Sequence, residues 1–291
     1  MKTAIVTGST GFIGQRLAAK LKSLEWNVIE LTRKAYDVSK DEDGAKLRAI
    51  FEKEKPNAVF HLASKFLAEH KSEDLPGVIE SNVLLGARLL QTITETSTAD
   101  APIDFLTAGT GWQRFSKEDG SAVNLYAATK AAFSAVTDYY SMAANIRTAE
   151  LRLFDTYGPG DTEKKIVQQL FDTAKNPPAA PLDFSPGQQK LYMVHVDDAV
   201  NAFVVAEGWL SKQPMRTRGV FRVDAESMIT LKDLAREVEM LTKSKLAITW
   251  GGRPYRDREV MLPYSELKRI PGWAPTISLR QGLRDLLESS K

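Results

Sequence analysis

The chain has 291 residues, 43% of them hydrophobic, enough for a large core built as one α/β unit or two unequal domains. Its 39 basic and 37 acidic residues leave a formal charge of +2, which does not indicate nucleic acid or an acidic surface as partner. The absence of cysteine excludes disulfides, thiolate zinc sites and cysteine nucleophiles. Neither a membrane-length apolar run of ~18 residues nor a signal-peptide pattern is present, so we expect a cytoplasmic protein and no metal site.

Apolar segments of strand length alternate with helical patterns through the first half of the chain. This alternation predicts an α/β fold with a Rossmann-type, doubly wound parallel sheet that carries helices on both faces. The expected strands are Thr3–Thr7, Asn27–Leu31, Ala58–Leu62, Ile103–Thr107 and Thr148–Leu153. The expected helices are Phe12–Leu24, Asp43–Glu54, Gly77–Thr98 and Ala122–Asn145.

The pattern changes after Gly158, where prolines and glycines mark a loop-rich region. A helix over Asp197–Trp209 and a strand over Val220–Val223 are expected to return to the main sheet. Capping boxes at Thr230/Asp233 and Ser278/Gln281 predict two further helices, ending near Leu241 and Glu288. We therefore expect a Rossmann domain over 1–157, with return segments near 195–224, and a smaller C-terminal α/β lobe from 158–194 and 225–291.

A glycine-rich turn joins the first strand to the first helix, with glycines at every third position. Glycines there permit a tight turn and let a pyrophosphate approach the backbone, while the helix N-terminus offers free N–H groups. The alternative is an ordinary strand-to-helix turn. We expect a dinucleotide to be held here by Gly8, Thr10, Gly11, Phe12, Ile13 and Gly14.

The end of the second strand indicates which nicotinamide cofactor is used. An acidic residue there usually binds the ribose 2′-hydroxyl, but this chain has Thr32 followed by Arg33 and Lys34. Two cations suit a 2′-phosphate, so we expect NADP(H) rather than NAD, with a solvated loop or a role for Glu30 as alternatives. Further along, Asp37 of the Asp37–Val38 pair either accepts from the adenine amino group or caps the next helix.

Tyr126 and Lys130 lie four residues apart in a predicted helix, so their side chains leave the same face. An ammonium beside a phenol favours the phenolate and improves proton exchange with an alcohol or a ketone. A surface Tyr and Lys on an amphipathic helix is the alternative. Together with the glycine turn, the pair indicates a redox enzyme.

These motifs give the chain a specific resemblance to extended short-chain dehydrogenase/reductases of the nucleotide-sugar epimerase/dehydratase type. Val59–Ser64 resembles the family's fourth strand, Leu151–Pro159 the stretch after its sixth, and Val194–Ala199 a segment beyond the substrate loop. More narrowly, Gly109–Gln113, Asn124–Lys130 and Phe154–Gly158 resemble the CDP-abequose and CDP-paratose synthase branch, which reduces a 4-keto sugar with NADPH.

The resemblance implies roles for individual residues. Tyr126 would pass the proton to the sugar oxygen at C4, and Lys130 would lower the pKa of Tyr126 and hold the nicotinamide ribose. The family's small residues after the fourth strand, here Leu62, Ala63 and Ser64, would face the cofactor, and Asn82 stands at a polar position in a helix interior. The resemblance also implies a homodimer formed through the helices near Asn82–Gln91 and Tyr126–Tyr140.

The chain departs from the family at the hydroxyl that polarises the carbonyl. Alignment places Ala108 where the family has a catalytic Ser or Thr, so Thr110 or Thr107 must supply the group. We favour Thr110, which lies past the strand end, over Thr107, which we expect to face the sheet.

Several residues are candidates for binding a nucleotide-diphosphate sugar. Arg253 suits a diphosphate because a guanidinium binds phosphate bidentately. Lys164 and Lys165 lie where the family holds the nucleotide, with a solvated helix face as the alternative. Trp112 and Gln113 either line the sugar pocket or, for Trp112, belong to the core. Asp155 replaces the family's Asn and is expected to be structural or to meet a sugar hydroxyl.

The leading hypothesis is an NADPH-dependent reductase of a 4-keto nucleotide-diphosphate deoxysugar. A 4-epimerase or dehydratase that retains its nicotinamide is the alternative, although Gly109–Gly111 lacks the acidic pair of dehydratases and Thr32–Arg33 lacks the acid of NAD-binding epimerases. A non-catalytic NADP-binding relative is the third hypothesis.

Overall fold

A six-stranded parallel sheet forms the centre of the computed structural model, which describes residues 1–41, 44–161, 163 and 165–289. The strand order is β10-β5-β4-β3-β1-β2, and every neighbouring pair is parallel, which confirms the predicted doubly wound sheet. The strands are β1 (Thr3–Thr7), β2 (Asn27–Leu31), β3 (Ala58–His61), β4 (Asp104–Thr110), β5 (Thr148–Leu153) and β10 (Arg218–Val223).

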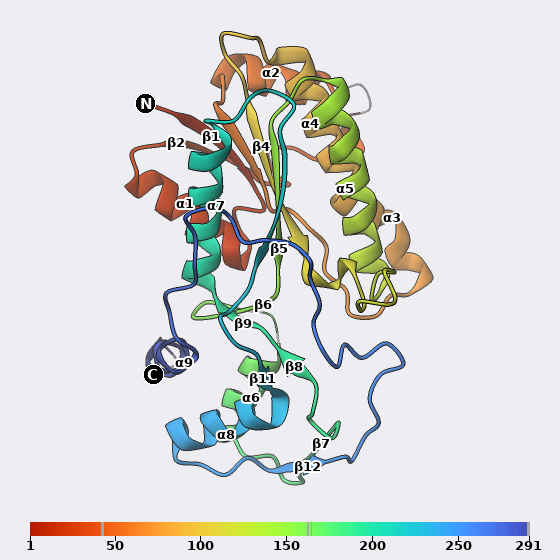
Figure 1. The fold of residues 1–291 in the computed structure, drawn as a ribbon, viewed down its shortest axis with the longest axis vertical. Helices are drawn as coiled ribbons and strands as arrows, with labels where there is room; N and C mark the ends of the chain where they lie inside the picture. The colour runs from red at the N-terminus through yellow and green to blue at the C-terminus, as the bar shows by residue number, and fades with distance from the viewer. Residues whose placement is uncertain (42–43, 162, 164, 290–291) are drawn as a thin grey trace.

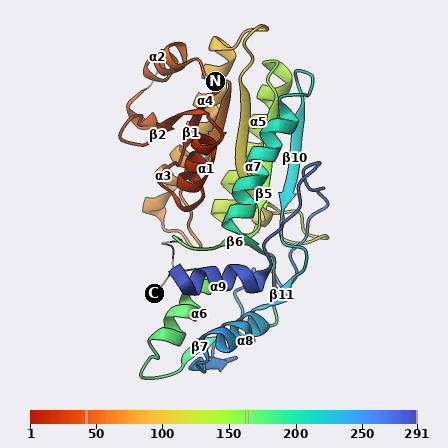
Figure 2. The ribbon, with the colours of Figure 1, turned by 90° about the vertical axis from the view of Figure 1, so that its left-hand side faces the viewer.

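Helices cover both faces of this sheet (Figures 1 and 2). One face carries α1 (Phe12–Ser23) and α7 (Val196–Leu210), and the other carries α2 (Ala45–Glu54), α4 (Leu85–Thr96) and α5 (Leu125–Ala143). Successive residues of a strand point to opposite faces of the sheet and so enter two separate hydrophobic cores. The residues in both cores are apolar because helices cover both faces. The expected helix start at Asp43 lies outside the described residues. Within the described part of the chain, no helix is both long enough and apolar enough to cross a membrane.

The helix predicted over Gly77–Thr98 is divided by a π-helical turn. It consists of α3 (Leu75–Ile79), the π-turn η3 (Glu80–Leu84) and α4. The wider turn directs Asn82 into the interior, where its side chain is 0% exposed. Its Oδ1 accepts from the Lys65 N–H at 2.7 Å, and its amide donates to the Thr129 hydroxyl at 3.0 Å. The periodicity of apolar residues contains no signal for this irregular turn, which is held by hydrogen bonds from distant residues.

A smaller lobe lies beyond the carboxyl ends of the strands (Figure 1). Its core joins α6 (Ile166–Lys175), α8 (Leu231–Thr242) and α9 (Leu279–Ser289). The Thr230 hydroxyl accepts from the Asp233 N–H at 3.0 Å, the predicted cap of α8. Short strand pairs complete the lobe and join it to the sheet: β7 (Leu182–Phe184) with β12 (Ile248–Trp250), β8 (Lys190–Leu191) with β11 (Ile229–Thr230), and β6 (Asp155–Tyr157) with β9 (Met193–His195).

The contact between α4 and α5 requires a glycine. A Cβ added at Gly86 would collide with the ring of Phe133, which is 2% exposed and has no room to move away. We predict that Gly86→Ala lowers the free energy of unfolding by ~1–3 kcal/mol, through overpacking. Gly208 of α7 is the matched control, because a Cβ there meets no atom within 4 Å.

Gly208→Ala should raise stability by ~0.5–1 kcal/mol, since alanine is the better helix former. Urea unfolding of both variants checks the pair. Equal effects of the two substitutions would contradict the proposed close packing of α4 on α5.

Candidate active site

The glycine-rich turn between β1 and α1 presents an open backbone. Gly8 has a φ of +69°, and a Cβ there would lie 2.6 Å from the Ala63 nitrogen at the end of β3. A Cβ on Gly14 would collide with the Gly8 carbonyl oxygen. Gly11, the N-cap of α1, contributes no side-chain hydrogen bond, so the first N–H groups of the helix are left for a ligand. The free N–H groups at the start of α1, the helix dipole and the lack of side chains at the three glycines together fit a pyrophosphate.

The loop after β2 presents cations at its surface. Arg33 and Lys34 are exposed, and the Thr32 carbonyl accepts from the Tyr36 N–H at 2.9 Å, which closes a tight turn. Glu30 forms an ion pair with Lys22 of α1 at 2.6 Å, and the hydrogen bond from Lys22 lowers the pKa of that carboxyl.

Beyond this turn, Asp37 caps the short helix η1 (Val38–Lys40), where its carboxylate accepts from the Ser39 N–H at 3.2 Å. The hydrogen bonds from Ser39 lower the pKa of Asp37. Of the two roles open from the sequence, the structure shows helix capping. Val38 packs against the core on the α4–α5 face.

Tyr126 and Lys130 lie in the first turns of α5, whose start is fixed by a side-chain cap. The Asn124 side chain accepts from the Ala127 N–H at 2.9 Å. Lys130 is only 4% exposed, and burial lowers its pKa to about 8, although the Glu150 carboxylate opposes the shift. Burial raises the pKa of Tyr126 to about 12, so the expected lowering by Lys130 is wrong for the structure: the group that lowers it is Ser64, by a hydrogen bond, and burial outweighs that. The phenol of Tyr126 is therefore protonated near neutral pH and available as a proton donor.

The surroundings of Tyr126 include two residues whose roles the sequence did not indicate. Ser64, expected to face the cofactor, interacts with the phenol and donates to Asn82 Oδ1 at 3.1 Å. Phe66 lies edge-on to the Tyr126 ring, with centroids 5.0 Å apart, and 6.1 Å from the Trp112 ring. Phe66 is 43% exposed, so it forms an accessible aromatic wall with the half-buried Trp112 beside the phenol. The one signal for Phe66 in the sequence was its place two residues after Ser64, which was expected to face the cofactor.

The two candidate threonines differ in what their hydroxyls do. Thr107 is 2% exposed and donates to the His61 carbonyl over 3.4 Å, within the sheet. Thr110 ends β4, and its hydroxyl accepts from the Trp112 N–H at 3.2 Å, so its own proton stays available to donate. His61 itself is buried against Thr7, its Nδ1 lying 2.8 Å from that hydroxyl, and burial lowers its pKa to about 3.

Gln113 lies in the interior rather than on a pocket wall. It is 5% exposed, its Oε1 accepts from the Thr110 N–H at 2.7 Å, and its Nε2 donates to Glu150 at 2.9 Å. Glu150 also pairs with Arg152 and Arg218. Burial opposes its ionisation, but the two guanidinium groups outweigh it and lower the pKa of Glu150 to about 2. The sequence indicated none of this charged cluster.

The expected substrate residues are dispersed. Asp155 accepts from the Tyr192 N–H at 3.2 Å, and burial raises its pKa to about 6, which fits the structural alternative. Lys165 pairs with Asp161 at 3.0 Å and lies 5.2 Å from the Phe12 ring, at the start of α1. Exposed Arg253 follows β12, at the end of the lobe farthest from the sheet (Figure 1). Lys164 lies outside the described residues.

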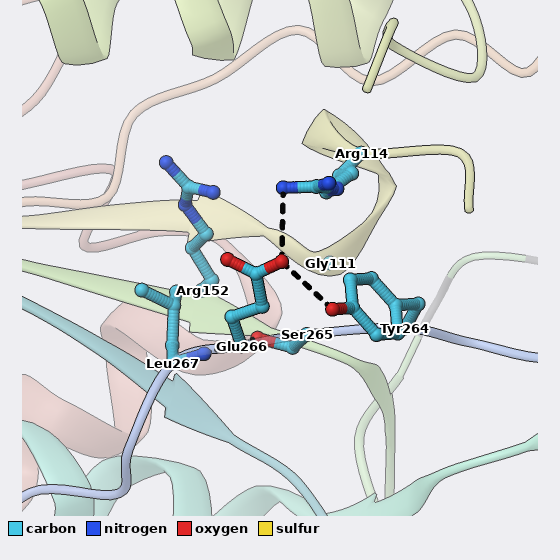
Figure 3. Close-up of a pocket in the computed structure, with 7 residues that line it drawn as sticks. All are labelled: Gly111, Arg114, Arg152, Tyr264, Ser265, Glu266 and Leu267. Atoms are coloured by element: carbon cyan, nitrogen blue, oxygen red, sulfur yellow. Dashed lines mark hydrogen bonds and ion pairs between the residues drawn. The ribbon is translucent and has the colours of Figure 1, made fainter. Parts of the chain in front are cut away.

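A C-terminal strap, residues 251–278, runs from β12 back to the strand ends and contacts the loop before α5. Arg258 of the strap donates to the Ser121 hydroxyl at 2.8 Å and to the Val123 carbonyl at 3.2 Å. Further along, Glu266 accepts from the Tyr264 hydroxyl at 2.7 Å and lies 3.6 Å from Arg114. Figure 3 shows Tyr264, Glu266 and Arg114 around a cavity of about 90 Å³, which Arg152 also lines.

Comparison with known proteins agrees with this geometry. The sequence profile of the NAD dependent epimerase/dehydratase family matches residues 4–213. CDP-abequose synthase of Salmonella typhimurium is 27% identical over 98% of this chain and 97% of its own length. The corresponding enzyme of Yersinia pseudotuberculosis is 25% identical over 91% of this chain and 93% of its own length.

Solved structures share the fold. UDP-glucose 4-epimerase of Thermotoga maritima, solved with UDP-glucose, superposes with a TM-score of 0.83 at 20% identity and covers 99% of this chain and 98% of its own. The Thermus thermophilus UDP-glucose 4-epimerase complex with NAD gives 0.78 at 20% identity, over 99% of this chain and 98% of its own. The glycine turn, the Tyr126–Lys130 pair and the profile match agree, and the chain is an enzyme that belongs to the NAD dependent epimerase/dehydratase family.

Proposed function

We propose that the protein is an NADPH-dependent reductase of the 4-keto group of a nucleotide-diphosphate deoxysugar, similar to CDP-abequose synthase. The observation that carries the proposal is Tyr126 one helical turn before the buried Lys130 on α5, in a chain that aligns along nearly its whole length with CDP-abequose synthases. The apolar Phe66–Trp112 wall beside the phenol suits the deoxygenated carbons of such a sugar.

In this mechanism the bound cofactor supplies the hydride, and the side chains manage the proton and the charge. Tyr126 gives its proton to the C4 oxygen as that oxygen gains negative charge. Lys130 stabilises the resulting phenolate while it carries its own positive charge, which it loses as the pH rises through about 8. Thr110 donates its free proton to the same oxygen and so polarises the carbonyl. Ser64 interacts with the phenol of Tyr126 and is itself positioned by its hydrogen bond to Asn82.

The reaction is tested with purified protein, NADPH and a CDP-4-keto-3,6-dideoxyhexose. Wild-type protein should consume NADPH and form the 4-hydroxy sugar. Tyr126→Phe should lower kcat at least ~100-fold, because positioned proton donors contribute factors of about that size. Thr110→Val should also lower kcat, whereas Thr107→Val, in the sheet interior, serves as the control.

Two outcomes would contradict the proposal. Tightly bound nicotinamide in the purified protein, with no net NADPH consumption, would indicate an epimerase or dehydratase. Full kcat in Thr110→Val together with loss in Thr107→Val would transfer the hydroxyl role to Thr107. Thermal stabilisation by a set of nucleoside diphosphates identifies the base independently of turnover.

For the cofactor, we propose NADP(H), supported by exposed Arg33 and Lys34 after β2 and by the pairing of Glu30 with Lys22. A 2′-phosphate would gain a charge-assisted hydrogen bond of ~1.5–3 kcal/mol, so NADPH should bind about tenfold or more tightly than NADH. Arg33→Ala should remove most of this preference without weakening NADH binding.

Lys212→Ala, a change of an exposed lysine in the loop after α7, is the matched control for that measurement. Fluorescence titration of both cofactors checks the three proteins. A tenfold preference of the wild type for NADH would overturn the assignment.

We further propose a homodimer formed through the outer face of α4 and α5, which lie side by side in Figure 1. Tyr139 and Met142 of α5 expose 66% and 60% of their surface, and Leu84, the N-cap of α4, exposes 38%. Light scattering should give twice the chain mass for the wild type. Met142→Glu should shift the protein towards monomer, and Met240→Glu on α8, at a residue 58% exposed, should not. A monomeric wild type would contradict this interface.

A further inference from the structure

Glu150 is a charged side chain in the interior of the main domain that the mechanism above does not use. It is 2% exposed, on β5, and faces α5. Its carboxylate accepts from the Ser134 hydroxyl at 2.5 Å, from Gln113 Nε2 at 2.9 Å, from Arg152 at 2.9 Å and from Arg218 at 2.5 Å. A buried ion pair rarely adds net stability over apolar packing, so the stability of the fold alone does not account for this cluster.

One arm of the cluster reaches the helix that carries the proposed catalytic pair. Ser134 lies one helical turn after Lys130, on the same face of α5, and its hydroxyl hydrogen-bonds to Glu150. The ammonium of Lys130 is attracted by the Glu150 carboxylate through the same interior. Arg218 also reaches the Ser134 hydroxyl, at 3.0 Å. This carboxylate therefore ties α5 to β5 through Ser134.

The second arm reaches the strand end that carries Thr110. Gln113 bridges the two: it donates to Glu150, and it accepts from the Thr110 N–H at 2.7 Å. Gly109 makes room for the bridge, because a Cβ there would lie 2.6 Å from Gln113 Oε1 and 2.7 Å from Glu150 Oε1. Gly109 thus leaves the space, and Gln113 connects the backbone of Thr110 to Glu150.

We propose that Glu150 is a positioning residue of the active site, which holds α5, and with it Lys130, in register with the Thr110 strand end. The inference rests on the proposed roles of Lys130 and Thr110. Glu150 touches neither substrate nor cofactor and acts through Ser134, Gln113 and the charge that it places near Lys130.

The sign of the effect on Lys130 follows from the charges around it. Glu150 is the negative group that faces Lys130 from β5, while Arg152 and Arg218 stand behind it. His61 on β3 is neutral, with a pKa of about 3, and Tyr126 on the same helix is neutral, with a pKa of about 12. Glu150→Gln would leave the two arginines unopposed, which disfavours the ammonium and lowers the pKa of Lys130.

The test measures the titration of Lys130 directly, by NMR of protein labelled with ¹³C at lysine Cε and assigned with Lys130→Arg. The wild-type signal should titrate near pH 8. Glu150→Gln should move the midpoint down by about one pH unit or more, which is a tenfold change in proton affinity. Arg152→Gln should move it up, since Glu150 then has one guanidinium fewer to neutralise it.

Asp138→Asn is the matched control, because Asp138 pairs with the same Arg218 at 2.5 Å but is 59% exposed, at the surface of α5. Its midpoint should equal that of the wild type. An unchanged midpoint in Glu150→Gln, or equal shifts in Glu150→Gln and Asp138→Asn, would overturn the proposal and leave Glu150 a structural residue. If Glu150→Gln does not fold, Arg152→Gln decides by the direction of its shift.

Gln113→Leu separates the two arms. It should lower kcat for the sugar about tenfold or more through the misplaced Thr110, with KM little changed and the Lys130 midpoint unmoved. Wild-type kcat in Gln113→Leu would overturn the Thr110 arm. Failure of the wild type to reduce any 4-keto sugar would refute the proposed function instead. The NMR titration needs no substrate, so it would still decide the effect of Glu150 on Lys130.

Discussion

The active site depends on polar side chains that are buried beneath α5. Lys130, Glu150 and Asn82 are 4%, 2% and 0% exposed, and each reaches α5 or lies on it. A buried charge or amide without partners would cost several kcal/mol, so Glu150 and Asn82 are tolerable only in the arrangement that pairs them. That requirement fixes α5 against β5 and η3 more strictly than apolar packing would, because hydrogen bonds are directional and hydrophobic contacts are not.

Much of the fold could be predicted because its main elements are local in sequence. β1, β2 and β5 have the expected bounds, since each is a short, largely apolar segment, and β2 and β5 each follow a helix. The strand pairs of the lobe were not predicted, because segments of two or three residues carry no periodicity. The π-turn at Asn82 was missed for a different reason: its hydrogen bonds come from Lys65 and Thr129, which only the folded chain brings near.

The site was predictable where a motif is compact. The glycine turn and the Tyr126–Lys130 pair each fit within eight residues, and the structure shows the open backbone that the turn implies and places the pair on one helix, although the burial of Lys130 was not predicted. Residues that act across the fold left no such pattern. Glu150 reads as one polar residue in a strand, Gln113 as a candidate for the pocket wall, and Arg258 as one more cation in a charged loop. The hydrogen bond between Gln113 and Glu150 spans 37 positions of the chain, and the one from Arg258 to Val123 spans 135.

The grip of Arg258 on the loop before α5 has a consequence for protein engineering. The strap belongs in sequence to the lobe, yet its guanidinium binds Ser121 and Val123, immediately upstream of the Asn124 cap and Tyr126. A chimaera that exchanged only the lobe with that of a relative would separate this arginine from the loop it holds. Residues 115–123 should therefore be transplanted together with the strap, as a single module, if a new sugar specificity is to be grafted without disturbing the catalytic helix.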